Sequence, residues 1–331
     1  MLSETIHPMQ IRSFTPAVGT VLAPMAGVTD AAFRRLARDF GAGWTVGEMV
    51  ASEARLRETE KTTERFRIDP QDPFPVVQLL GSDPGEMASA AQFAQTQGAR
   101  AVDINFGCPA RVVCGKACGS ALMQEPELAE AIVRATVAAV EIPVTVKMRT
   151  GWNAEHKNAV ELARRFEASG AALLTVHGRT RADKFSGHAE YRTIADVAHA
   201  VSIPVIANGD ITTPEKALSV MEVTGAAGVM MGRGAVGNPW LFSRTKALLE
   251  GRRDPGEPSV REVRETIRRH FAWHLEASAA DARYALRSFR KFLPPYLAHC
   301  PGGVEAARGL VREETPEGLL RALDAYFQIV A

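Results

Sequence analysis

The sequence predicts an α/β protein built on a (β/α)8 TIM barrel, followed by a small C-terminal helical domain. Short apolar runs rich in β-forming residues recur eight times within the first 235 residues, and segments rich in Ala, Leu, Glu and Arg separate most of them. A strand–helix unit repeated eight times is typical of a parallel sheet closed into a barrel. The eight runs are Thr20–Pro24, Trp44–Glu48, Pro75–Leu79, Ala101–Asn105, Pro143–Lys147, Ala172–His177, Pro204–Asn208 and Ala227–Met231.

The segments between these runs carry helix signals. Gly98, Gly170 and Gly225 each follow such a segment directly before the next strand, where glycine commonly ends a helix. An open doubly wound sheet is the alternative fold. That fold favours a Gly-x-Gly-x-x-Gly turn after an early strand, and no early strand here is followed by one. The clearest helical segments are Ala88–Thr96, Glu127–Val140, Ala159–Ser169 and Pro214–Thr224.

The pattern changes after residue 248. Glu250–Pro258 is rich in Gly, Pro and charge, which is typical of a linker. Ser259 and Glu262 then form a capping-box pattern that opens an amphipathic helix. Further helices are expected at Ala282–Leu293, where Pro294 and Pro295 should stop the helix, and at Pro316–Ile329. We therefore divide the chain into a barrel at 1–248, a linker at 249–258 and a helical domain at 259–331.

Composition indicates an ordinary soluble protein. Hydrophobic residues make up 46% of the 331 residues, and 39 cations oppose 38 anions, so there is no global basic signal for nucleic acid. No signal peptide is visible, and no apolar stretch approaches the roughly 20 residues that span a bilayer. The four cysteines read as reduced thiols rather than a disulfide framework. We expect a cytoplasmic protein without membrane association.

Polar residues stand where the apolar runs end. In barrels of this type the active site lies at the carboxyl ends of the strands, so these residues should meet on one rim. Each residue alone could be an ordinary structural residue of a loop or of the barrel rim, but the whole set is hard to explain in that way. Lys147 continues a strand into the interior, where an unpaired ammonium is costly. The strand-end residues are Gln78, Asn105, Lys147, Arg149, His177, Arg179, Asn208–Asp210, Gly232 and Arg233.

The turns after the seventh and eighth strands suggest an anion site. Gly209 and Gly232 would let the backbone approach a phosphate closely, and Arg233 adds a bidentate donor. Barrels often hold a phosphate at this place. The alternative is that these turns simply need glycine.

Several of these segments closely resemble bacterial tRNA-dihydrouridine synthases, most of all the B-type subgroup. The resemblance extends from about Leu22 to the final helices. It implies an FMN-containing barrel with a C-terminal helical domain that uses NADPH, or NADH, to reduce a uridine in the D-loop of tRNA. It also suggests position 17 as the target, and we expect a monomer without an obligate protein partner. The segments are Ala23–Asp30, Asp103–Pro109, Lys116 with Gly119–Leu122, Lys147–Trp152, His177–Thr180 and Ile206–Ile211.

The resemblance assigns roles to the strand-end residues. Pro24, Met25 and Ala26 would lie along the flavin ring, and Gln78 would bind its polar edge. Lys147 would sit near the pyrimidine side of the ring, where negative charge accumulates on reduction. Asn105 and Arg179 would face the uracil. The phosphate-bearing end of the cofactor would be held by His177, Asn208, Gly209, Asp210, Gly232 and Arg233.

Cys108, in the segment Asn105–Pro109, is then the expected proton donor. Flavin would deliver hydride to C6 of the uracil, so C5 needs a proton from a positioned acid on the other face. A thiol with a pKa near 8.5 suits that role, provided that it stays a thiol. The competing reading is a small buried apolar residue.

A basic stripe on the C-terminal helices is the expected tRNA contact. Arg283, Arg287, Arg290 and Lys291 fall largely on one side of a helix. Relatives often carry His where this chain has Phe292, which removes one expected polar contact. Two further phosphate candidates, Arg111 and Lys116, lie on the loop that bears Cys108.

Cys114 and Cys118 depart from the family pattern. With Cys108 they invite a metal or cluster reading, but no Cys-x2-Cys pair or nearby His supports it, so no metal site is expected. Two other functions remain open. The chain could be an FMN barrel oxidoreductase of a small molecule, similar to dihydroorotate dehydrogenase, or a non-catalytic RNA-binding protein on a relict barrel.

Overall fold

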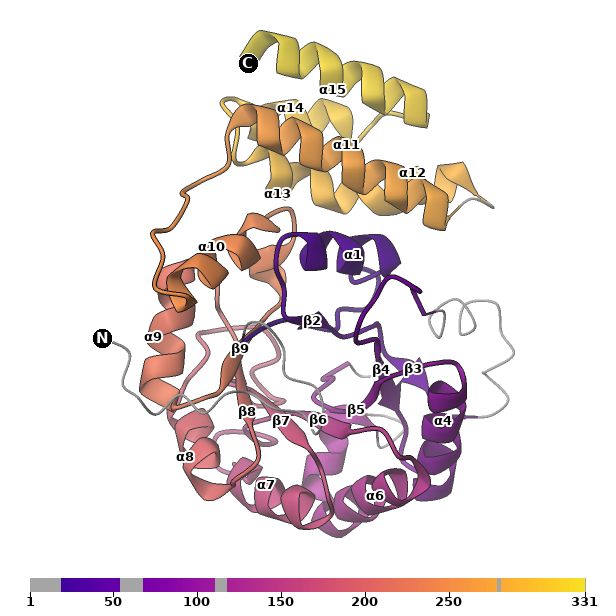
Figure 1. Ribbon diagram of the computed structural model, residues 1–331, viewed down its shortest axis with the longest axis vertical. Coiled ribbons are helices and arrows are strands. Elements are labelled where there is room, and N and C mark those ends of the chain that lie inside the picture. Colours follow the sequence, from indigo (N-terminus) through magenta and orange to yellow (C-terminus); the bar gives the residue numbers. More distant parts are fainter. Residues whose placement is uncertain (1–18, 54–67, 111–117, 279–280, 331) are drawn as a thin grey trace.

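A parallel sheet curled into a barrel forms the larger part of the protein (Figure 1). The computed structural model describes residues 19–53, 68–110, 118–278 and 281–330. Within these residues the sheet has the order β2-β1-β9-β8-β7-β6-β5-β4-β3, and every pairing is parallel. The strands are β1 (Thr20–Leu22), β2 (Trp44–Thr45), β3 (Val50–Ala51), β4 (Val76–Leu80), β5 (Ala101–Phe106), β6 (Val144–Arg149), β7 (Leu173–His177), β8 (Val205–Asn208) and β9 (Gly228–Met231).

The two ends of the sheet meet, which makes the structure a barrel. The predicted run Trp44–Glu48 supplies β2, and the unpredicted β3 follows it after a short break. Between them, Val46 forms a parallel bridge with Val76 of β4, and the Gly47 N–H donates to the Val76 carbonyl at 3.1 Å. β2 and β3 therefore share one barrel position. The (β/α)8 prediction is confirmed and the open sheet is excluded.

Helices cover the outside of the barrel, and the four segments predicted by range are all helical, with small shifts at their ends. α4 begins four residues before the predicted Ala88, because Asp83 caps it and Pro84 occupies the first turn, where proline is tolerated. Gly98, Gly170 and Gly225 all have positive φ, between 64° and 95°, as expected for helix-ending glycines. The barrel helices are α1 (Ala31–Asp39), α4 (Pro84–Thr96), α6 (Pro126–Ala139), α7 (Ala159–Ala168), α8 (Arg192–Ala200), α9 (Pro214–Thr224) and α10 (Trp240–Leu249).

The C-terminal segment is helical, as predicted, but one predicted stop is wrong. Pro294 and Pro295 do not end the helical path; they lie in the first turn of α13, where their missing N–H groups need no partner. The Ser259–Glu262 capping box is present. The helices are α11 (Val260–Ala277), α12 (Ala282–Phe289), the 3₁₀ turn η3 (Arg290–Phe292), α13 (Leu293–Leu297), α14 (Gly303–Leu310), which was not predicted, and α15 (Pro316–Val330).

The C-terminal helices stack against one side of the barrel, above α1 and α10 (Figure 1). Phe33 of α1 packs on Phe292 with ring centroids 5.3 Å apart, and both side chains are fully buried. A single apolar core therefore continues from the barrel helices into the C-terminal helices. None of the described helices is both long and apolar enough to cross a bilayer. The division at residues 248 and 259 stays a prediction.

The barrel and the C-terminal helices approach each other closely at Gly237. It has φ +65°, and a β-carbon there would lie 2.6 Å from the Tyr296 nitrogen in α13. Gly251 has a similar φ of +70°, but nothing would lie within 4 Å of its β-carbon. We expect Gly237→Ala to lower the free energy of unfolding by about 2 kcal/mol more than Gly251→Ala, because only Gly237→Ala adds an overpacking clash to the backbone strain. Urea unfolding measures both values, and equal losses would contradict the close approach.

Candidate active site

A cavity of about 900 Å³ opens at the carboxyl ends of the strands. Parallel register brings the strand-end residues together: Asn105 is level with Lys147, Arg149 with His177, and His177 with Asn208. The volume falls within the roughly 300–1,000 Å³ that ligand pockets occupy. The predicted site residues that line the cavity are Pro24, Met25, Ala26, Gln78, Asn105, Cys108, Lys147, His177, Asn208, Gly209, Asp210, Gly232 and Arg233.

A buried hydrogen-bond chain fixes the amides on one wall of the cavity. The Asp103 carboxylate accepts from the Thr145 hydroxyl at 2.6 Å and from Gln78 Nε2 at 2.7 Å. This orients Gln78 so that its Oε1 accepts from Asn105 Nδ2 at 2.9 Å. Each amide therefore has one possible orientation. Burial raises the pKa of Asp103, although both hydrogen bonds oppose that shift.

The loop of Cys108 is held from three sides. Asn105 Oδ1 accepts the backbone N–H groups of Gly107 and Cys108, at 3.0 and 2.9 Å. Arg149 Nε donates to the Gly107 carbonyl at 2.7 Å, and Ser120 Oγ donates to the Cys108 carbonyl at 2.9 Å. The half-buried Cys108 side chain faces the cavity on this fixed backbone.

Arg149 is a site residue whose role was not predicted from the sequence. Its side chain is almost fully buried, and its NH1 donates to the carbonyls of Thr180 and Lys184, each at 2.8 Å. It therefore joins the loop after β7 to the Cys108 loop. Its place two residues after Lys147 on β6 was the available signal, because alternate residues of a strand share a face.

Lys147 presents a cation to the interior of the cavity. Its Nζ donates to Asn208 Oδ1 at 3.1 Å, while Asn208 Nδ2 donates to the Met230 carbonyl at 2.8 Å. Burial, together with the Arg149 charge, lowers the pKa of Lys147 to about 8, whereas Asp103 and Cys108 oppose the shift. Such a group stays cationic at neutral pH and is strongly poised to interact with a neighbouring anion.

His177 is a neutral hydrogen-bonding group rather than a cation. Burial lowers its pKa to about 2, and the charges of Lys147, Arg149, Arg179 and Arg233 act in the same direction. The cations therefore gather around an uncharged imidazole. A site with this charge balance favours an anionic ligand.

Arg179 does not line the cavity, which differs from its predicted contact with a base. It is 2% exposed, and both of its terminal nitrogens donate to Asp210, at 2.9 and 2.7 Å. The carbonyls of Ser186 and Gly187 accept from its Nε and NH2 groups. Arg179 therefore shapes the turn after β8 from beneath, because a bidentate arginine–carboxylate pair fixes both partners.

The turn after β8 has an unusual backbone. Gly209 has φ +127°, and Asp210 has φ +49°, a value uncommon for a residue with a side chain. The Tyr191 hydroxyl donates to the Gly209 carbonyl at 2.9 Å and holds the turn from outside. Arg233, whose side chain is 61% exposed, reaches Asp210 at 3.4 Å. Arg233 also lines the cavity, so its exposed guanidinium is accessible to a ligand there.

Phe185 is a second cavity residue that was not predicted. It is 56% exposed, although it is large and apolar. The guanidinium carbons of Arg149 and Arg233 each lie 5.4 Å from its ring centroid. An exposed aromatic ring supported by cations is a suitable surface for stacking a planar ligand.

Three residues of the predicted basic stripe are exposed, and the fourth is hydrogen-bonded within the protein. Arg283, Arg287 and Lys291 are exposed, whereas Arg290 is half-buried and donates to the Glu313 carbonyl at 2.6 Å. Phe292 is fully buried between the barrel and the C-terminal helices. Arg111, Lys116 and Cys114 lie outside the described residues.

The basic stripe is connected to the cavity wall. Lys291 interacts electrostatically with Glu48, and the Glu48 carboxylate accepts the N–H of Gly27, next to the cavity-lining Ala26. The loop after β1 therefore faces the cavity on one side and the C-terminal helices on the other.

Comparisons with known proteins identify the family. A family model described as "Dihydrouridine synthase (Dus)" matches residues 21–329. A Pseudomonas putida protein named tRNA-dihydrouridine synthase B is 46% identical over 298 residues, covering 90% of this chain and 88% of its own length. A Vibrio vulnificus protein of the same name is 42% identical over 324 residues, covering 98% and 100%.

Solved structures with similar folds are much more distant in sequence. A 2-naphthoyl-CoA reductase complex aligns with a TM-score of 0.60 and 11% identity, over 76% of this chain and 53% of the other. Histamine dehydrogenase from Rhizobium sp. 4-9 aligns with a TM-score of 0.56 and 13% identity, over 81% and 50%. The chain spans about half the length of these structures, and the likeness shows the fold alone.

Gln78→Glu tests the hydrogen-bond chain. The substitution replaces the donor that faces Asp103 with an oxygen and brings two carboxyl groups together. We expect the free energy of unfolding to fall by about 3 kcal/mol at neutral pH, as for an uncompensated buried charge. The pair would hold a proton that the unfolded chain lacks, so the loss should grow as the pH rises above about 4.3, the pKa of a free Glu.

Chemical unfolding at pH 5 and pH 8 measures this loss. Gln328→Glu, at an exposed position of α15, is the control and should change stability little at either pH. A Gln78→Glu protein as stable as the control at pH 8 would show that the chain does not constrain Gln78.

Proposed function

The chain belongs to the dihydrouridine synthase family, and we propose that it is a tRNA-dihydrouridine synthase that reduces the C5–C6 bond of a D-loop uridine. The observation that carries this proposal is that Cys108 and Lys147 line the same cavity. The Lys147 ammonium and the Cys108 thiol each have a defined task in the reduction of a uracil. An acid close to a buried cation suits the addition of hydride and proton across a double bond.

The cavity has the donor groups that FMN requires. Gln78 and Lys147 would hold the polar edge of the ring, with Pro24, Met25 and Ala26 beside it. Gly232 has no side chain where a β-carbon would fill space 3.5 Å from Met25 Sδ, which leaves room for a planar group. His177, Arg233 and the Asn208–Asp210 turn would hold the phosphate. When bound, the flavin supplies the hydride for C6 and draws its electrons from NADPH.

Cys108 completes the reaction by transferring its thiol proton to C5. Hydrogen bonds restrain its backbone, because its N–H donates to Asn105 and its carbonyl accepts from Ser120, so the thiol needs little reorganisation to reach its target. Proton transfer to carbon requires the acid to be protonated, so the reaction uses the thiol rather than the thiolate. Asn105, which lines the cavity, would face the uracil, and Phe185 would position it by stacking.

The C-terminal helices provide the surface for tRNA. Arg283, Arg287 and Lys291 are exposed cations on consecutive helical turns and are suited to phosphate contacts. The D-loop uridine must leave its stack to enter the cavity, at a cost of a few kcal/mol that phosphate contacts would offset. We therefore assign FMN binding and catalysis to residues 1–248 and tRNA binding to residues 259–331.

Cys108→Ala should separate binding from chemistry. We expect the variant to bind FMN and tRNA as the wild type does, and to lose turnover by about 10²- to 10⁴-fold, the usual contribution of a general acid. Single-turnover oxidation of the reduced flavin by tRNA measures the step. Cys300→Ala removes a buried thiol outside the cavity and should keep the wild-type rate. A wild-type rate in Cys108→Ala would refute the acid assignment.

Charge removal from α12 should weaken tRNA binding alone. We expect Arg283→Gln/Arg287→Gln to reduce tRNA affinity and to flatten its logarithmic salt dependence by about 0.7–0.9 per lost phosphate contact. Arg192→Gln, on the exposed face of α8, is the control. Fluorescence anisotropy across a salt series gives both slopes. If the double variant and the control bind tRNA equally, α12 does not form the contact.

A further inference from the structure

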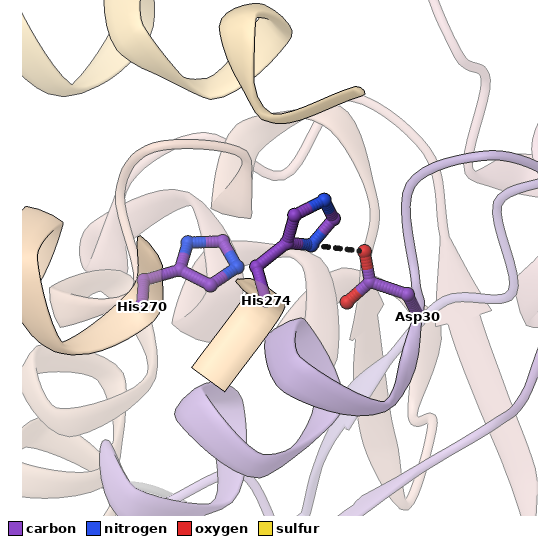
Figure 2. Close-up of side chains that lie close together, drawn as sticks. All are labelled: Asp30, His270 and His274. Atoms are coloured by element: carbon purple, nitrogen blue, oxygen red, sulfur yellow. Dashed lines mark ion pairs between the residues drawn. The ribbon is translucent and has the colours of Figure 1, made fainter. Parts of the chain in front are cut away.

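Asp30, His270 and His274 come together between the barrel and the C-terminal helices (Figure 2). Asp30 precedes α1, whereas the two histidines lie one turn apart on α11. One ligand atom from each residue lies within 4.8 Å of the others, and no other such group of three occurs in the described part of the chain. We propose that these three residues form a binding site for a zinc-like divalent transition-metal ion, independent of the flavin cavity.

The hydrogen bonds of His274 leave its Nδ1 without a proton and facing the Asp30 carboxylate, an arrangement that a cation would stabilise. Ser288 Oγ donates to the Ala285 carbonyl at 3.0 Å, so it accepts from His274 Nε2 at 2.7 Å. Nε2 therefore carries the proton, and the Nδ1 lone pair of a neutral imidazole points at Asp30 Oδ2, 3.0 Å away. A lone pair and a carboxylate at this distance repel each other unless a proton or a metal ion lies between them.

The surroundings of His270 favour a metal ion over a proton between His274 and Asp30. Its ring is fully buried, and Nδ1 lies 3.0 Å from the Tyr296 hydroxyl. Among the described residues, its Nε2 has no hydrogen-bond partner, and Figure 2 shows this edge of the ring turned toward His274. A proton on His274 would satisfy only Asp30 and His274. A metal ion would satisfy all three groups, because Nε2 offers its lone pair when Nδ1–H donates to Tyr296.

The three groups match the coordination chemistry of zinc. Two imidazoles and one carboxylate, with a water molecule as the fourth ligand, make a common tetrahedral set. Ligand atoms around Zn²⁺ lie roughly 3.3 Å apart, so the His270 ring has to move by at most about 1.5 Å. The outer nitrogens of both histidines contact hydroxyl groups, and a hydrogen-bond partner at that nitrogen is the usual support for a metal-bound imidazole.

The surroundings allow access to the site and limit its chemistry. The Asp30 side chain is 26% exposed, so an ion can arrive from that side, whereas Phe33, Phe289 and Phe292 close the other sides. Arg34 and Lys291 both interact electrostatically with Asp30, and Glu48 partly balances both. Nitrogen ligands favour zinc or a similar transition metal over Ca²⁺ or Mg²⁺.

A bound ion would fasten α11 to the loop that forms one wall of the cavity. Asp30 follows Met25–Thr29, whose turn is closed by the Thr29 N–H donating to the Met25 carbonyl at 3.0 Å. The metal would therefore fix the C-terminal helices relative to that wall. Because it binds outside the cavity, its presence does not depend on the flavin or on the proposed reaction.

Zinc titration of the metal-stripped, purified full-length protein tests the site. We expect calorimetry with ZnCl₂ to give one ion per chain and thermal denaturation to show a raised midpoint with zinc. Asp30→Asn keeps an N-cap oxygen for the Phe33 N–H but removes the carboxylate, so it should bind zinc at least tenfold more weakly. His270→Phe fills the buried volume without a ligand atom and should have the same effect.

Controls make each outcome decisive. His199→Ala removes an exposed histidine on α8 and should leave zinc binding unchanged. Circular dichroism and urea unfolding without zinc would show that the variants are folded. If the wild type binds no zinc, or if Asp30→Asn and His270→Phe bind it as tightly as the wild type, the cluster is an ion pair with a neighbouring imidazole and the proposal is wrong.

Discussion

Asp103 is a buried ionisable group behind the cavity wall that Gln78 and Asn105 form, and the arrangement of the site follows from its hydrogen-bond partners. Its carboxylate can only accept hydrogen bonds when ionised, so Thr145 and Gln78 must donate to it. That requirement sets the Gln78 amide, which sets the Asn105 amide, which in turn receives the N–H of Cys108. A buried carboxylate thus determines the position of a thiol five residues further along the chain. Buried networks of this kind specify one arrangement because any unsatisfied member is costly.

The electrostatics of the cavity follow from parallel register. Strands β6 and β7 end level with each other, so Lys147, Arg149 and His177 are brought into one small volume. Burial and mutual repulsion then act together: the pKa of Lys147 is lowered, and His177 is kept neutral. Asp210 offsets part of the charge, but Arg179 pairs with it from below. The remaining positive field is available to an anionic ligand, which agrees with a cofactor phosphate.

The junction between the barrel and the C-terminal helices combines apolar and polar contacts. Phe33, Phe289 and Phe292 form its buried aromatic part, and His270 lies among them. A buried imidazole surrounded by rings has few possible partners, so its orientation toward His274 and Asp30 is restricted. The same loop that supplies Asp30 also lines the cavity through Met25 and Ala26. A contact between the C-terminal helices and Asp30 therefore also restrains Met25 and Ala26 on the same loop, where the flavin ring would lie.

The sequence by itself determined the repeating architecture and most of the cavity wall. Alternating apolar runs and helical segments predict a parallel barrel, and in such a barrel strand-end residues such as Gln78, Lys147 and Asn208 must share one rim. Side-chain partners were decided only by tertiary structure. Arg179 and Arg290 were predicted to face nucleic acid, but nearby acceptors engage them: the Asp210 carboxylate for Arg179 and the Glu313 carbonyl for Arg290. The grouping of Asp30 with His270 joins residues 240 positions apart in the chain. Spacing along a chain gives the face on which a residue lies, whereas its bonding partner depends on which distant segment packs against that face.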